Sequence, residues 1–264
     1  SLVVPVWLPL EQAVRAIRRL QTTHGLTVRT LSLDPGAYLL SETGGLRRRV
    51  LDVVALLGGN GFPLTIVGRG VGETVLEGNL QVRRGCRVVL NNISIVNPTG
   101  PGILVSTGGK LDATNIEVTN CSGRGVAVIG SISAPASARF QDCIVSNCQG
   151  AGIFVAQSNV FIDDCSVVKN AMTGVIARAK AWVQIRGSRT VVEDNPNALS
   201  SADGAEVELI FDANDCGERP SIADSGRENR SGWGRCFSKC DGPGIRRWIP
   251  FLPTDKDQST KSLL

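Results

Sequence analysis

Aspartates and arginines in the middle of the chain are the side chains best suited to bind a cation or move a proton. Asn92, Asn115, Asp142 and Asp164 recur at intervals of 23, 27 and 22 residues, and Asp163 precedes the last of them. If each interval is one turn of a repeating fold, Asp142 and Asp164 lie about 5 Å apart. Carboxylates that close repel each other, so a cation bridges them, one pKa rises, or they tilt apart toward water.

Two readings of these residues remain open. In the functional one, Asp142, Asp163 and Asp164 act with Arg139 or Arg186 as catalytic groups, and Asp142 and Asp164 are the oxygen ligands of a Ca²⁺ ion. A carboxylate pair near 5 Å would also suit a retaining glycosidase. In the structural one, Asn and Asp share this position because both suit the turn before a strand.

The side chains are positioned by a repeat of about 23 residues. A short strand ending in Asn recurs, with those Asn at 97, 120, 147, 170 and 195. A Gly-led apolar run and a third alternating run follow in each period, so every period holds three strands. This predicts an all-β, right-handed, single-stranded parallel β-helix. The stacked Asn would form an amide ladder, and Asn147→Ala is expected to cost about 1–3 kcal/mol.

Three segments follow from the repeat. Residues 1–21 hold an N-terminal segment and a helix whose apolar positions 10, 13, 14, 17 and 20 would cap the first coil. Residues 22–212 form the β-helix. Residues 213–264 lose the repeat and are expected to be an irregular C-terminal cap or partner-binding extension rich in Cys, Gly and Pro.

Two phrases, Leu31–Leu40 and Leu64–Gly78, resemble the opening coils of the pectin-lyase-like superfamily. With the repeats, the resemblance covers residues 10–212 and implies the β-helix fold and a link to polysaccharides. Lyase-like members use Asp clusters for Ca²⁺ and a basic residue, often Arg, as the proton acceptor. The Asn-Thr-Asp and Arg-Ile-Lys phrases of polygalacturonase-like members are absent, and no His follows His24.

Composition limits the function. The chain has 28 Lys and Arg against 24 Asp and Glu, a net charge of +4, and 42% hydrophobic residues. This composition excludes a disordered tail and a coiled coil. The sequence has no basic face with interleaved aromatic residues, so nucleic acid is not expected as a partner. No run approaches the roughly 20 apolar residues of a membrane span. With a single His, the first hypothesis is a non-catalytic, rigid structural or binding module, a subunit of a larger assembly. The alternative is a carbohydrate-active enzyme, a Ca²⁺-dependent lyase of acidic polysaccharides or a glycoside hydrolase.

The sequence gives fewer indications of the partners and the cellular compartment than of the fold. Arg groups at 47–49, 83–87 and 246–247 suit an acidic polysaccharide or an anionic protein surface, and the extension 213–264 suits a partner protein. The pairs Cys121 with Cys148 and Cys143 with Cys165 should stack as reduced core thiols, whereas Cys216, Cys236 and Cys240 favour a disulfide. The chain starts with Ser, so an extracellular or organelle-luminal location follows if a targeting segment was removed.

Overall fold

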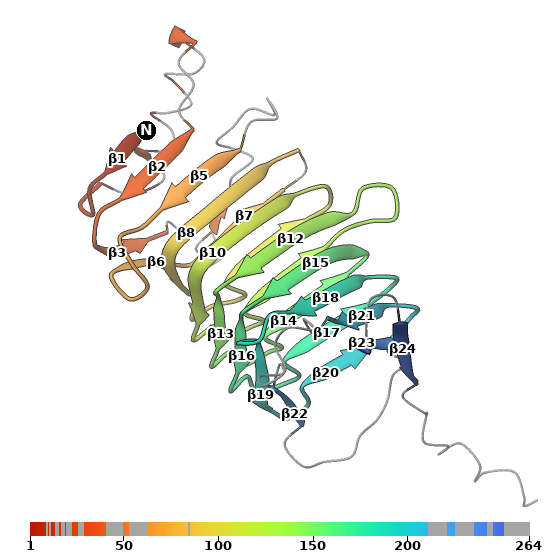
Figure 1. Ribbon diagram of the computed structural model, residues 1–264. Helices are drawn as coiled ribbons and strands as arrows, with labels where there is room; N and C mark the ends of the chain where they lie inside the picture. The colour runs from red at the N-terminus through yellow and green to blue at the C-terminus, as the bar shows by residue number, and fades with distance from the viewer. Residues whose placement is uncertain are drawn as a thin grey trace, which may run out of the picture.

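The computed structural model describes residues 1–8, 10, 12, 13, 16, 19, 23–25, 29–40, 50–52, 63–83, 85–210, 221–224, 235–241 and 245–250. Three parallel sheets run along the molecule, and each coil of the chain adds one strand to each sheet in turn (Figure 1). The predicted all-β fold, with coils of about 23 residues, is confirmed.

Sheet 1 carries the candidate residues on its outward face. Its strands, in spatial order, are β1 (Leu2–Val4), β2 (Thr30–Leu33), β5 (Leu64–Val67), the first half of β8 (Arg87–Val96), the first half of β10 (Lys110–Thr119), β12 (Ala136–Gln141), β15 (Ser158–Asp163), β18 (Trp182–Arg186) and β21 (Glu206–Leu209).

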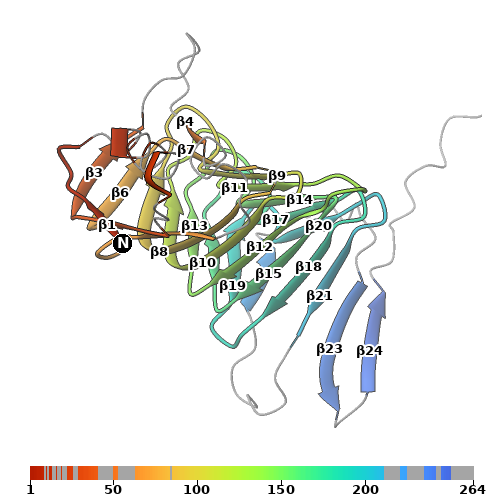
Figure 2. The ribbon, with the colours of Figure 1, turned by 90° about the horizontal axis from the view of Figure 1, so that it is seen from above.

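Sheets 2 and 3 complete the coil. Sheet 2 contains β3 (Gly36–Leu39), β6 (Thr74–Glu77), the second halves of β8 and β10, β13 (Ile144–Ser146), β16 (Ser166–Val168), β19 (Val191–Asn195) and β22 (Ser221–Asp224). Sheet 3 contains β4 (Val50–Asp52), β7 (Asn79–Val82), β9 (Ile103–Ser106), β11 (Val126–Ile129), β14 (Ile153–Ala156), β17 (Val175–Arg178) and β20 (Leu199–Ser201), and it lies along the upper side of the β-helix in Figure 2.

Alternation along each strand builds the core. In β9, Ile103 and Val105 are fully buried while Leu104 and Ser106 face outward, and the same pattern repeats in β14 and β17. Apolar residues of successive coils therefore stack on one another, because parallel in-register strands place equivalent side chains about 4.8 Å apart. Each coil is held mainly by the coils on either side of it.

A row of glycines sets the corner between sheets 2 and 3. Gly102, Gly125, Gly152 and Gly174 each precede a strand of sheet 3, and a Cβ at any of them would come within 2.5–2.7 Å of a valine Cγ1 of sheet 2. The Gly-led runs of the sequence are thus explained by close approach between two sheets.

The longest interval of the repeat, 27 residues, results from one longer loop. From β11 to β12 the chain makes a longer excursion through residues 130–135, which contain a turn bridged between Ser131 and Ala134. Four more residues lie here than between β9 and β10, as the pairings Ser106 with Ile129 and Lys110 with Ser137 show. The 27-residue interval therefore leaves the register of the strands intact.

The two ends add features that the repeat alone does not predict. β1 pairs with β2 before any helical residue, so sheet 1 begins within the first four residues. The helical residues described between 10 and 24 include Leu10 and Ala13, which are buried in the core. No helix among the described residues is both long and apolar enough to span a membrane.

At the C-terminal end, β22 pairs with β19, so sheet 2 extends past residue 212. β23 (Arg235–Asp241) and β24 (Ile245–Pro250) form an antiparallel pair. The predictions that concern Cys216, the side chains of Cys236 and Cys240, and the Arg groups at 47–49 and 246–247 lie outside the residues and side chains that the structure describes.

Candidate functional site

The candidate aspartates lie at the corner between sheets 1 and 2. Asn92, Asn115, Asp142 and Asp164 occupy equivalent positions there, and all four have left-handed backbones with φ between 49° and 57°. Asn and Asp tolerate this conformation better than other residues with a side chain. The predicted equivalence of the four is thus observed, and the left-handed turn explains why each of these four positions holds Asn or Asp.

Amide pairs and carboxylate pairs in this row are stabilised differently. Asn115 donates an Nδ2 hydrogen bond to Asn92 Oδ1 at 2.8 Å, because an amide carries both a donor and an acceptor. Two carboxylates offer only acceptors. Arg189 supplies the donors: its Nη2 lies 2.6 Å from Asp142 Oδ1 and 2.9 Å from Asp164 Oδ2, and its backbone N–H also donates to Asp164 Oδ1. We call Asp142, Asp164 and Arg189 the corner clamp.

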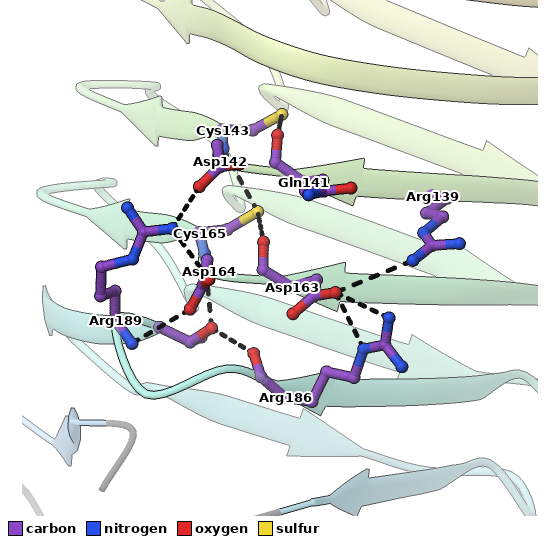
Figure 3. Close-up of polar contacts among 10 residues, drawn as sticks. Arg139, Gln141, Asp142, Cys143, Asp163, Asp164, Cys165, Arg186 and Arg189 are labelled. Carbon is purple, nitrogen blue, oxygen red and sulfur yellow. Dashed lines mark hydrogen bonds and ion pairs between the residues drawn. The ribbon is translucent and has the colours of Figure 1, made fainter. Parts of the chain in front are cut away.

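Asp163 belongs to a second ion-pair group on sheet 1. Arg186 donates from Nε and Nη2 to Asp163 Oδ2 at 2.9 and 2.7 Å, and Arg139 Nη2 lies 3.8 Å from the same oxygen. Asp163 sits between these arginines because Arg139, Phe161 and Gln184 form one row of sheet 1 and Gln141, Asp163 and Arg186 the next. Figure 3 shows this group beside the corner clamp.

The two groups together hold three aspartates and three arginines, so their formal charges cancel. Burial tends to raise the pKa of the Asp164 carboxyl, but hydrogen bonds from Arg189 and the nearby positive charges of Arg189 and Arg186 outweigh it and hold that pKa below its usual value. Asp164 therefore stays ionised at neutral pH. Of the three outcomes considered for the stacked carboxylates, bridging by a cation is the one observed, and the cation is a guanidinium.

An aromatic pair lies next to Asp163 on the same outward face. The rings of Phe161 and Trp182 meet edge to face, with centroids 5.1 Å apart and planes at 82°. Both side chains are partly exposed, and Asn159 lies in register with Trp182. The face of sheet 1 here combines apolar ring surface with guanidinium and amide groups.

The donor set at the corner does not fit Ca²⁺ well. Calcium takes six to eight oxygen ligands. The facing oxygens of Asp142 and Asp164 are both bound by Arg189, whose positive charge opposes a second cation. Among the described residues, no group of three or more His, Cys, Asp or Glu side chains is arranged to hold a metal.

Comparisons with known proteins bear on the fold. Residues 76–195 match the family model described as "Right handed beta helix region". The protein is a right-handed parallel β-helix. No curated protein matches the chain in sequence.

Two solved structures resemble the β-helix. The A-module of the Azotobacter vinelandii mannuronan C-5 epimerase AlgE4 is 11% identical, with 89% of this chain and 96% of that chain covered and a TM-score of 0.35. The ORF18 protein of Geobacillus virus E2 is 9% identical, with 83% and 55% covered and a TM-score of 0.32. Likenesses this remote carry no argument about activity.

The predicted ladder of five Asn is wrong as a single stack. The β-helix divides it into two rows, because Ser146 is in register with Val168 and with Glu193. Asn120 and Asn147 lie one position after their strands, in an outward row with Lys169 and Asp194, and all four have positive φ of 52–56°. Asn97, Asn170 and Asn195 point inward and are 0–2% exposed.

The inward row is a chain of buried hydrogen bonds. Asn195 Oδ1 accepts from the backbone N–H and the Nδ2 of Asn170, and Asn170 Oδ1 accepts from the N–H of Cys148 at 3.1 Å. Asn195 Nδ2 donates to the carbonyls of Val167 and Glu193. The row continues as Cys148 and Cys121, where a thiol replaces the amide.

The stacking of the cysteine pairs is observed. Cys143 lies in register with Cys165, whose sulfur accepts a hydrogen bond from the Cys143 N–H, and Cys121 precedes Cys148 by one coil. All four are buried and present as free thiols. Hydrogen bonding to the neighbouring thiol, together with burial, raises the pKa of Cys121 and of Cys165.

Sequence reasoning missed Arg189. Arg139 and Arg186 were the expected partners of the stacked carboxylates, but both pair with Asp163 instead. The available signal was a corner two residues longer: Gly187–Thr190 spans the gap that Asp164 and Cys165 span one coil earlier. The extra length lets Arg189 reach back over two coils.

Proposed function

We propose that this protein is a non-catalytic β-helix that acts as a rigid binding or structural module. The observation that carries this proposal is the pairing of all three candidate carboxylates with arginine, at 2.6–2.9 Å for the shortest contact of each. A general base or nucleophile needs a lone pair directed at its substrate. Here one oxygen of Asp142, one oxygen of Asp163 and both oxygens of Asp164 accept hydrogen bonds from arginine within the protein.

Rigidity supports the binding role. Three parallel sheets share one core, and their outward faces are fixed rows of side chains spaced by about 4.8 Å. A ligand bound to such rows meets groups that are already ordered, which reduces the entropy cost of association. His24, the single His of the chain, is exposed in the N-terminal helical segment, outside the ion-pair groups.

A second candidate function, a carbohydrate-active enzyme, is favoured by the aromatic pair. Phe161 and Trp182 present partly exposed ring surface beside Arg139, and aromatic surface packs well on the apolar faces of sugar rings. Arg139 is 49% exposed and makes only the longer contact to Asp163, so it has donors to offer a uronate carboxylate. This supports binding of an acidic polysaccharide, and cleavage would require Asp163 to leave Arg186.

The two functions are separated by measuring cleavage and cation binding together. The protein is incubated with pectate and with alginate, with and without Ca²⁺, and unsaturated or reducing ends are measured. In parallel, thermal melting is followed as Ca²⁺ is added to the wild type, Asp142→Ala, Asp164→Ala and Arg189→Gln.

We expect no cleavage and no saturable Ca²⁺ stabilisation of the wild type, and a Ca²⁺-dependent rise in Tm only for Arg189→Gln, where the carboxylates lose their guanidinium. Cleavage of either polymer would overturn the proposal. So would wild-type stabilisation by Ca²⁺ that both Asp substitutions abolish, because it would establish a cation site.

A further inference from the structure

The outward face of sheet 3 carries an apolar stripe that runs across four coils. Leu104, Ala127, Phe154 and Ile176 occupy equivalent positions of β9, β11, β14 and β17 and are joined by the strand register. Leu104, Phe154 and Ile176 are partly exposed, and the small Ala127 between the first two is buried. The turn after β11 adds Ile132, which is 79% exposed.

On the strands that carry the stripe and on their two neighbours, the charged side chains have one sign. None of the strands β7, β9, β11, β14, β17 and β20 contains Asp or Glu. The guanidinium of Arg124 lies over the Phe154 ring, 3.8 Å from its centroid, and Arg178 is exposed at the end of β17. Within the described part of the chain neither Arg has a carboxylate partner, in contrast to the arginines of the corner clamp and sheet 1.

We propose that the sheet 3 stripe is a docking surface for an amphipathic helix of a partner protein, with an apolar ridge flanked by Asp or Glu. Lying across the strands, such a helix presents one apolar residue per turn of about 5.4 Å, close to the coil spacing of about 4.8 Å. Over four coils the two spacings drift apart by only about 2 Å. Its acidic flanks would pair with Arg124 and Arg178.

Other occupants fit these observations less well. A second copy of the chain would bring the same arginines into the interface without any carboxylate from the four strands that carry the stripe, β9, β11, β14 and β17. An acidic polysaccharide needs hydrogen-bonding groups, and the stripe residues have only hydrocarbon side chains. An extended peptide places side chains of one face about 6.7 Å apart, which differs more from the coil spacing of about 4.8 Å than the helical spacing does.

The test is a fluorescence-anisotropy titration of the full chain with a labelled helical peptide of about 18 residues, having Leu once per turn and Glu on both flanks. We expect saturable binding that weakens by at least about tenfold for Arg124→Gln/Arg178→Gln and for Ile176→Thr. A peptide with Lys in place of Glu should not bind. Arg87→Gln, on the outward face of sheet 1, is the matched control and should bind like the wild type.

Circular dichroism and thermal melting confirm that each variant is folded. Absence of saturable binding overturns the proposal, as does binding that the sheet 3 substitutions leave unchanged. Light scattering that shows a dimer broken by Ile176→Thr but not by the peptide would assign the stripe to a second copy instead. The inference deepens the proposed binding role and rests on it, but polysaccharide cleavage would overturn that role and leave the peptide result standing.

Discussion

The two corners that flank sheet 2 both carry outward Asn or Asp residues with left-handed backbones, and the corner with sheet 3 adds an inward row of Asn. At the corner with sheet 1, Asn and Asp point outward and are present because the backbone turns left-handed there. At the corner with sheet 3, Asn170 and Asn195 point inward and bind backbone groups of neighbouring coils. At the outward positions Asn and Asp occur because they tolerate a left-handed backbone. At the inward positions Asn occurs because buried backbone groups need hydrogen-bond partners.

The largest effect is expected for Asn195→Ala. The substitution leaves the Asn170 N–H and the Val167 and Glu193 carbonyls without this partner in a buried position. Each buried unsatisfied group costs about 1–3 kcal/mol, so we expect a loss of about 3 kcal/mol or more in the free energy of unfolding. Urea denaturation monitored by circular dichroism measures it, and a loss below about 1 kcal/mol would contradict the inward hydrogen-bond chain.

The second effect tests the glycine row at the same corner. In Gly152→Ala the new Cβ would lie 2.6 Å from Val167 Cγ1 and 2.8 Å from the Gly174 carbonyl oxygen, so sheets 2 and 3 must separate. We expect a loss of about 2 kcal/mol in the free energy of unfolding. Gly100→Ala is the control, because its Cβ would meet only the Asn97 amide nitrogen, at 3.4 Å. Equal losses for both variants would mean that close approach is not what selects glycine.

The third substitution, Asn147→Ala, separates the two rows of Asn. Asn147 is exposed, and its side-chain bond goes to the adjacent Ser146 hydroxyl. The main cost is therefore that of placing Ala at φ 54°, about 1 kcal/mol, and Asn147→Gly should cost less than Asn147→Ala. A loss at Asn147→Ala as large as that at Asn195→Ala would restore the single ladder predicted from sequence.

The smallest effect, Arg189→Gln, concerns the outward corner and depends on pH. Arg189 lowers the folded-state pKa of Asp164. The stabilisation is therefore present above the unfolded pKa of about 3.9 and is lost as pH falls through the lower folded value. At neutral pH we expect Tm to fall by roughly a few degrees, because exposed ion pairs contribute little.

At a pH below both values, wild type and Arg189→Gln should melt closer together than they do at neutral pH. Arg178→Gln provides the control, since Arg178 has no described carboxylate partner and its difference from wild type should not depend on pH in this range. A Tm difference for Arg189→Gln that is constant with pH would show that Arg189 does not act through Asp164.

How much of the fold and of the candidate site can be predicted depends on how far apart in the sequence the interacting residues lie. The three-strand period and the equivalence of Asn92, Asn115, Asp142 and Asp164 are local patterns repeated along the chain, and they are readable. The division of the five Asn into an inward and an outward row cannot be predicted from the sequence, because a shift of one position within a turn decides whether a side chain points in or out. Asn147 and Asn170 differ in this way although both follow a strand.

Contacts between coils are harder still. Arg189 reaches Asp142 across 47 positions, and the longer corner that contains it shows that the chain projects there but not which carboxylates Arg189 contacts. The apolar stripe of sheet 3 could have been found from the positions Leu104, Phe154 and Ile176, but only once the outward member of each apolar run was known. The first strand, β1, lies before the repeat and has no period to reveal it.

The loop at residues 130–135 shows where this architecture can grow. It takes up four extra residues without disturbing the pairing of β11 with β14 or of β12 with β15. The core fixes the register of the strands, so the length of this loop can change without altering the strand pairing. New segments can therefore be acquired here, by evolution or by grafting, at positions between two sheets whose faces are already in place.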